Sequence, residues 1–162
     1  MIDGDPSTAW MVGGTNDLVD RGGYSEYVAN SKGDFVPAIY IDLPNRMSID
    51  GIRIMPGYNK SPDVFKRNNR ITKIALHDSS WSFWEPSEGK PFAVGRFDDS
   101  MGWKTVSFKP QMLEQLQIEI QEWKKGTDND FCISEVELLS DGKPVSWERT
   151  PMMVYTTGDE CG

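Results

Sequence analysis

The chain has 162 residues, of which 38% are apolar and 26% are charged, a composition typical of one soluble globular domain. Its 17 basic and 25 acidic residues give a net charge of −8, which disfavours nucleic acid and anionic membranes as partners. No apolar run approaches the ~20 residues needed to cross a bilayer, so we expect no membrane insertion.

Short apolar runs with a period of two predict β-strands along most of the chain. The alternating sets are Ile39, Ile41 and Leu43; Ile52 and Ile54; Thr72, Ile74 and Leu76; Phe92 and Val94; and Val106 and Phe108. Each set is typical of a strand that has one face on a core. The single histidine, His77, follows one of these runs, and we expect it at a sheet edge or at the rim of the core.

The segment from Pro110 to Trp123 fits two patterns. Met112, Leu113, Leu116 and Ile120 lie at helical spacing, whereas Leu116, Ile118 and Ile120 alternate with polar residues as in a strand. Because β-branched residues and regular alternation favour the strand, we predict one from about Leu116, preceded by a turn.

The last predicted strand runs from Phe131 to Leu139. Regular alternation would place Cys132, Ser134, Val136 and Leu138 on one face and Ile133, Glu135 and Glu137 on the other. Two long segments rich in helix and strand breakers, Gly13 to Pro37 and Gly57 to Asn69, are expected to be loops without secondary structure of their own.

Short strands, long loops and the lack of helix–strand alternation predict an all-β sandwich or jelly roll. We assign residues 1–140 to this domain. Residues 141–162 carry several glycines and prolines, and we interpret them as a C-terminal covering segment or the start of a linker.

The motifs of common catalytic sites are missing from the sequence. No nucleophile elbow, phosphate-binding glycine loop or Cys-x-x-Cys pair occurs, and a single histidine cannot form a His-rich metal site. We therefore expect a binding protein and not an enzyme. A small hydrolase that uses paired carboxylates is the least favoured alternative, because any domain with 25 acidic residues can supply such a pair by chance.

Aromatic, amide and cationic side chains gather in the segment from Gly57 to Arg70, and two tryptophans lie in a polar stretch further on. These groups are suited to stacking on sugar rings and to hydrogen bonds with hydroxyls or carboxylates. The candidate ligand-binding residues are Tyr58, Asn59, Lys60, Arg67, Arg70, Trp81 and Trp84. In the alternative interpretation, Tyr58 and Phe65 pin a solvated loop to the core, and the tryptophans cap the open ends of the sandwich.

Oxygen-bearing side chains open the chain at Asp3, Asp5 and Thr8. They fit a calcium loop, but they fit equally an ordinary turn in which Asp5 or Ser7 caps its own backbone. Two cysteines far apart in the sequence leave a similar choice between two thiols and one disulfide.

Five motifs stand in the order seen in a known family. They are Asp3-Gly4-Asp5-Pro6-Ser7-Thr8-Ala9-Trp10, Ile49-Asp50-Gly51-Ile52-Arg53-Ile54, Gly57-Tyr58-Asn59-Lys60-Ser61, Phe65-Lys66-Arg67-Asn68-Asn69-Arg70-Ile71 and Asp130-Phe131-Cys132-Ile133-Ser134-Glu135-Val136. Together they resemble the discoidin-like, or coagulation-factor C-type, domains. The bacterial NAD glycohydrolase translocation subgroup is the closer resemblance, and it covers the chain to about Leu139.

The resemblance implies an eight-stranded antiparallel jelly-roll sandwich with ligand loops at one end. It implies a structural Ca²⁺ held by Asp3, Asp5 and Thr8 together with Glu135 from the last strand. It favours a disulfide between Cys132 and Cys161, as fits an exported protein. NAD glycohydrolase activity is not implied, because the catalytic domain of such toxins is a separate part that this chain does not resemble.

Two functions follow as expectations. The first is a noncatalytic glycan-binding module of a larger secreted or cell-envelope protein, with a cell-surface carbohydrate as its partner. The second is a protein-interaction or translocation module of a toxin or surface protein, in which the same loops bury against another protein.

Overall fold

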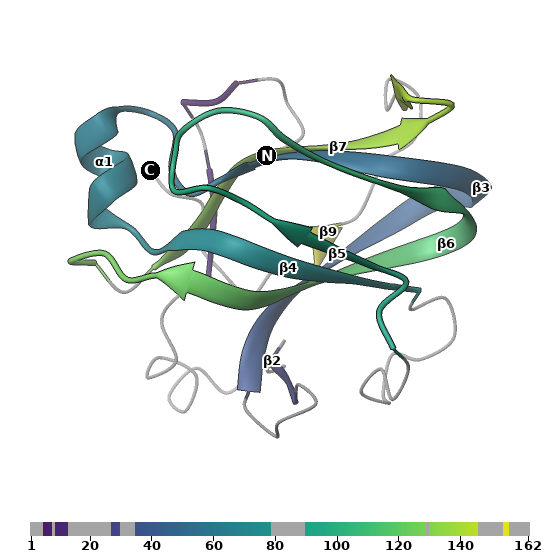
Figure 1. The fold of residues 1–162 in the computed structure, drawn as a ribbon, viewed down its shortest axis with the longest axis horizontal. Coiled ribbons are helices and arrows are strands. Elements are labelled where there is room, and N and C mark those ends of the chain that lie inside the picture. The colour runs from purple at the N-terminus through teal and green to yellow at the C-terminus, as the bar shows by residue number, and fades with distance from the viewer. Residues whose placement is uncertain are drawn as a thin grey trace.

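The computed structural model describes residues 5–7, 9–12, 27–29, 35–78, 90–128, 130–145 and 154–155. For residues 10–12, 27–29, 35–37, 44 and 154–155 it describes the backbone alone. The elements in chain order are β1 (Trp10–Val12), β2 (Tyr27–Ala29), β3 (Phe35–Pro56), α1 (Pro62–Arg67), β4 (Arg70–Asp78), β5 (Ala93–Arg96), β6 (Lys104–Lys124), β7 (Phe131–Ser140), β8 (Lys143–Pro144) and β9 (Val154–Tyr155) (Figure 1).

The described strands pair antiparallel in the order β1-β7-β3-β6-β4-β5. β3 and β6 span 22 and 21 residues, and both bend so that each contributes to two layers (Figure 1). The second half of β6 lies between the first half of β3 and β4, whereas the second half of β3 lies between the first half of β6 and β7. This arrangement is a β-sandwich, so the predicted all-β antiparallel fold is confirmed.

Extra residues at the bends accommodate two prolines. The pairing of β3 with β6 contains two bulges. Between Asp42 and Met47 the extra residues are in β3, and between Ser107 and Gln111 they are in β6. Pro44 and Pro110 lie in these two interruptions, where the missing N–H removes no ladder hydrogen bond. The turn predicted before Leu116 is therefore wrong, because β6 continues through the bulge as one strand.

The core between the layers consists of the aliphatic residues that the alternation predicted. Fully buried members include Ile39, Ile41, Ile52, Ile54, Ile74 and Leu76. Burial of each such side chain contributes about 1.5–3 kcal/mol, so these strands carry much of the driving force for folding. Phe92 and Phe108 pack edge to face at the margin, with ring centroids 5.0 Å apart.

β7 departs from regular alternation at Ser134. Met55 of β3 faces Glu135, yet the next residue, Pro56, faces Ile133, so Ser134 is an extra residue in β7. A bulge of this kind reverses which face the following residues occupy. Ile133 and Val136 therefore both pack in the core, whereas Cys132 packs in a separate outer cluster. The prediction that Cys132 shares a face with Val136 is wrong for this reason.

β5 also differs from its predicted pattern. Val94 was expected to face the core, but its side chain is 46% exposed. The inward positions are taken by Ala93 and Gly95. A Cβ added to Gly95 would lie 2.5 Å from a methyl of Val106, so only the smallest residue leaves room there.

The first and last parts of the chain meet β3 and β7. β1 pairs with β7, with Trp10 opposite Ile133. Beyond residue 140, β8 pairs with β7 and β9 pairs with β3. The described parts of the predicted covering segment thus extend the sheet. Within the described residues, no helix is both long and apolar enough to cross a membrane.

Candidate functional site

The segment between β3 and β4 was expected to lack secondary structure, but it contains α1. Ser61 caps this helix, with its Oγ accepting a hydrogen bond from Val64 N at 3.3 Å. Pro62 occupies the first turn, where its fixed φ suits a helix and no N–H is needed. Asn68 ends the helix by donating its backbone N–H to Val64 O. One helical turn therefore fixes the path of the loop.

Asn59 fastens the turn before α1 to two neighbours. Its backbone N–H donates to Ser134 Oγ at 2.8 Å, and its Oδ1 accepts from Gly102 N at 2.7 Å. Its Nδ2 donates to the carbonyls of Pro56 and Gly57, at 3.2 and 3.0 Å. The polar groups of Asn59 are thus committed to holding the β3–α1 turn against β7 and the β5–β6 connection.

Two buried asparagines hold the other end of the loop. Asn68 Nδ2 donates to Val64 O at 2.9 Å, and Asn69 Oδ1 accepts from Gly126 N at 3.1 Å. Asn69 N also donates to Asp130 O at 2.8 Å. α1, the β5–β6 connection and the β6–β7 connection therefore form one cross-linked group of loops at the α1 end of the sandwich (Figure 1).

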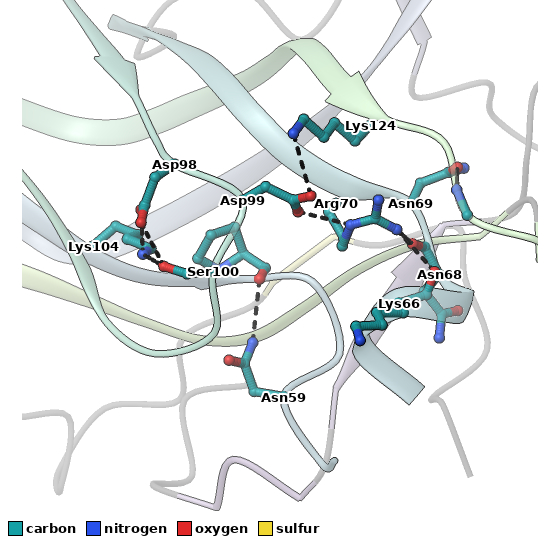
Figure 2. Close-up of polar contacts among 12 residues, drawn as sticks. Asn59, Lys66, Asn68, Asn69, Arg70, Asp98, Asp99, Ser100, Lys104 and Lys124 are labelled. Carbon is teal, nitrogen blue, oxygen red and sulfur yellow. Dashed lines mark hydrogen bonds and ion pairs between the residues drawn. The ribbon is translucent and has the colours of Figure 1, made fainter. Parts of the chain in front are cut away.

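An ion network lies over this group of loops. Arg70 Nε pairs with Asp99 Oδ1 at 2.7 Å, and Lys124 Nζ approaches the other oxygen of Asp99 at 3.4 Å (Figure 2). The Arg70 guanidinium also donates to Lys66 O at 2.8 Å, which links it to the last turn of α1. With only 14% of its side chain exposed, Arg70 mainly orders the loops.

The predicted ligand-binding residues divide into buried and exposed groups. Tyr58 is 6% exposed, packs with Ala9 and Cys132, and donates its hydroxyl to Ser7 O at 3.2 Å. Lys60 and Arg67 are exposed, and Arg67 pairs with Asp128 at 3.1 Å. The alternative role for Tyr58, that of pinning the loop, therefore fits its position.

Trp81 and Trp84 lie outside the described residues. The segment that contains them follows Asp78 at the end of β4, whereas the α1 loop leads into Arg70 at its start. A nine-residue strand separates its ends by roughly 26 Å. The two candidate contact regions are therefore connected to opposite ends of β4.

The predicted calcium ligands are described only in part. Asp5 is exposed and accepts a hydrogen bond from Ser7 N at 2.9 Å, as expected for a capped turn, and Glu135 is 2% exposed. The pairing of Trp10 with Ile133 directs the chain before β1 toward this part of β7. The carboxylate oxygens suit a hard cation, but Asp3 and Thr8 lie outside the described residues. Among the residues described, no group of three or more His, Cys, Asp or Glu side chains could hold a metal.

Cys132 is fully buried on the outer face of β7. Its thiol donates to Asn68 Oδ1 at 3.5 Å, a distance normal for sulfur. Cys161 lies outside the described residues, so the disulfide between them stays a prediction.

Three residues that the sequence interpretation did not select come together on the sheet. The Arg53 guanidinium lies 4.5 Å from the ring centroid of Trp103, and its NH1 pairs with Glu137 Oε2 at 2.9 Å. The sequence indicated only that Arg53 and Glu137 alternate with apolar residues in predicted strands, and that Trp103 is one of six tryptophans. The strand register was needed to bring them together.

A β-sandwich whose strand β1 pairs with β7, and whose described connections around α1 are cross-linked, fits a discoidin-like domain. The chain belongs to the NAD glycohydrolase translocation F5/8 type C domain family, whose sequence model matches residues 1–139. This confirms the family resemblance. The name of the family describes a translocation domain of the F5/8 type C. No curated protein matches the chain.

Solved structures with the same fold include carbohydrate-binding modules of family 32. The module of AlyQ, solved with 4,5-unsaturated mannuronic acid, has a TM-score of 0.54 at 15% identity, over 85% of this chain and 81% of that one. The module of Clostridium perfringens NanJ, solved with galactose, has a TM-score of 0.52 at 19% identity, over 84% and 79%. A structure of C. perfringens ZmpB, with two such modules and an M60 catalytic domain, has a TM-score of 0.57 at 15% identity, over 85% and 12%.

Proposed function

We propose that the chain is a noncatalytic glycan-binding module of a larger secreted or cell-envelope protein. The observation that carries this proposal is the match of residues 1–139 to an F5/8 type C domain. Two modules of the same fold were solved with sugars, and the ZmpB structure joins two such modules to a catalytic domain. An exported protein would meet such glycans outside the cell.

The cross-linked loops at the α1 end support binding there. Asn59, Asn68 and Asn69 hold the backbone in place, so a ligand would order few groups when it binds, which lowers the entropic cost. Exposed cations such as Lys60 and Arg67 supply donors for sugar hydroxyls or carboxylates. One such module would bind a single sugar with a dissociation constant of about 1 mM, and repeated modules would raise the apparent affinity by avidity.

A structural Ca²⁺ is part of this proposal. Asp3, Asp5 and Thr8 would hold it together with Glu135, and backbone carbonyls would complete its shell. The role of the ion would be to fasten the chain before β1 to β7. The carboxylates of Asp5 and Glu135 are the chemical type that calcium prefers.

A glycan array tests the proposal directly. We expect the wild-type chain to bind a glycan saturably. If the α1 end of β4 makes the contact, the double variant Lys60→Ala/Arg67→Ala should lose at least tenfold in affinity. If the other end makes it, Trp84→Ala should show that loss. Trp123→Ala is the matched control, because Trp123 is an exposed tryptophan (38%) outside the predicted contacts.

The second candidate is a protein-interaction or translocation module, which the name of the family favours. A flat array together with a defined protein partner that loses binding in the same variants would support it. That outcome would contradict the glycan proposal.

A further inference from the structure

Trp103, Arg53 and Glu137 form a stacked group on the outer face of the layer that contains β7. Trp103 belongs to the β5–β6 connection, Arg53 to β3 and Glu137 to β7. Arg53 lies over the indole ring at 4.5 Å and pairs with Glu137 at 2.9 Å. One aromatic ring, one planar cation and one carboxylate are thus held in a row by direct contacts.

The strand register explains why these side chains share a face. Arg53 lies opposite Glu137 in β7, and its neighbours Ile52 and Ile54 point into the core. In β7, Val136 and Leu138 likewise point into the core. Arg53 and Glu137 therefore project outward, where their side chains are 33% and 31% exposed.

The group adjoins the loops of the proposed site. Trp103 follows Gly102, whose N–H donates to Asn59 Oδ1 at 2.7 Å, and Lys60 is the next residue after Asn59. β3 and β7 run side by side into this end of the sandwich (Figure 1). The outer face of the layer is therefore continuous with the β3–α1 turn.

The chemistry of the group fits an uncharged sugar. A pyranose has an apolar C–H face that stacks on an indole ring and hydroxyls that both donate and accept hydrogen bonds. Arg53 NH1 faces Glu137 Oε2, and this oxygen is buried, so the groups left for neighbouring hydroxyls are the other guanidinium N–H donors and the acceptor Glu137 Oε1. Since the two charges cancel, the group offers no net attraction to an anionic ligand.

The geometry points to Trp103, Arg53 and Glu137 as a binding surface for an uncharged hexose residue of a glycan. This inference rests on the proposed glycan-binding function and names the contact residues and the class of sugar. The ion pair and the ring contact hold the side chains before the ligand arrives, which reduces the ordering cost of binding.

The test is an NMR titration of the indole N–H signals of the six tryptophans. The probes are galactose, glucose and mannose, with glucuronic acid as the anionic comparison, each to about 100 mM, well above a millimolar dissociation constant. The Trp103 signal is identified by its absence in Trp103→Phe. We expect it to shift saturably with at least one uncharged hexose and less with glucuronic acid.

Variants then measure the contribution of each group. We expect Trp103→Ala and Glu137→Gln to weaken hexose binding at least tenfold, whereas Trp123→Ala leaves it unchanged. Arg53→Lys keeps the charge and loses the planar fork, so it should also weaken binding. If Trp103→Ala fails to fold, the titration of the wild-type chain still decides the question.

The outcomes separate the two proposals. Glycan-array binding without a shift of the Trp103 signal, or with stronger shifts for glucuronic acid, would overturn the inference and leave the proposed function standing. A flat array and unshifted indole signals would overturn both.

Discussion

At the scale of single residues, a buried contact between a histidine and a carboxylate lies on the outer face of the other layer. His77 Nε2 and Glu119 Oε2 are 3.0 Å apart, and both side chains are 6% exposed. Burial alone would raise the pKa of Glu119, but hydrogen bonds from His77 and Gln121 and the charges of His77 and Lys73 outweigh it. The pKa of Glu119 therefore lies below its ordinary value of 4.5.

This pair predicts an acid-dependent loss of stability. A carboxylate whose pKa is lower in the folded chain stabilises it above the unfolded pKa, and that contribution is lost as the pH falls through the folded value. We expect Glu119→Gln to destabilise the chain by about 1–3 kcal/mol near neutral pH, and the difference from wild type to narrow in acid.

Urea unfolding between about pH 7 and about pH 3 measures this effect. Glu114→Gln is the control, because Glu114 is an exposed carboxylate on the same strand and lies away from the contact between His77 and Glu119. An unfolding free-energy difference for Glu119→Gln that stays constant with pH would contradict the assignment.

At the scale of elements, Gly126 determines how closely the β6–β7 connection approaches α1. A Cβ at this position would overlap the carbonyl of Arg67, and its amide donates to Asn69 Oδ1. Because the obstacle is backbone, a larger residue must displace the loop. We expect Gly126→Ala to cost about 1–3 kcal/mol of stability and to weaken ligand binding at the α1 end.

Thermal and urea unfolding of Gly126→Ala check this prediction. Thr127→Ala is the neighbouring control, since the Thr127 side chain is exposed. Unchanged stability in Gly126→Ala would show that the two loops are not packed as closely as described.

At the scale of the whole molecule, the proposed calcium ion would join parts of the chain distant in sequence. A ligand that binds only the folded state stabilises it by about 2.7 kcal/mol at 100 times its dissociation constant. We therefore expect Ca²⁺ to raise the melting temperature and a chelator to lower it. Glu135→Gln should abolish this response, whereas Glu122→Gln should keep it. A wild-type melting temperature that does not respond to calcium would refute the site.

The sequence by itself determined the class of fold and the family. Alternation at Ile39 and Ile41, and at Ile52 and Ile54, identified strands correctly, because burial of one face imposes a period of two. The ordered motifs identified the discoidin-like family without any structural information.

Only the tertiary structure decided the faces and the partners. The extra residue at Ser134 moved Cys132 to the outer face, and the bulge around Pro110 kept β6 unbroken. Trp103 and Arg53, fifty residues apart in sequence, meet because β3 and β6 are neighbours. Local alternation cannot reveal such features, because bulges and strand register are fixed by the packing of the two layers as a whole.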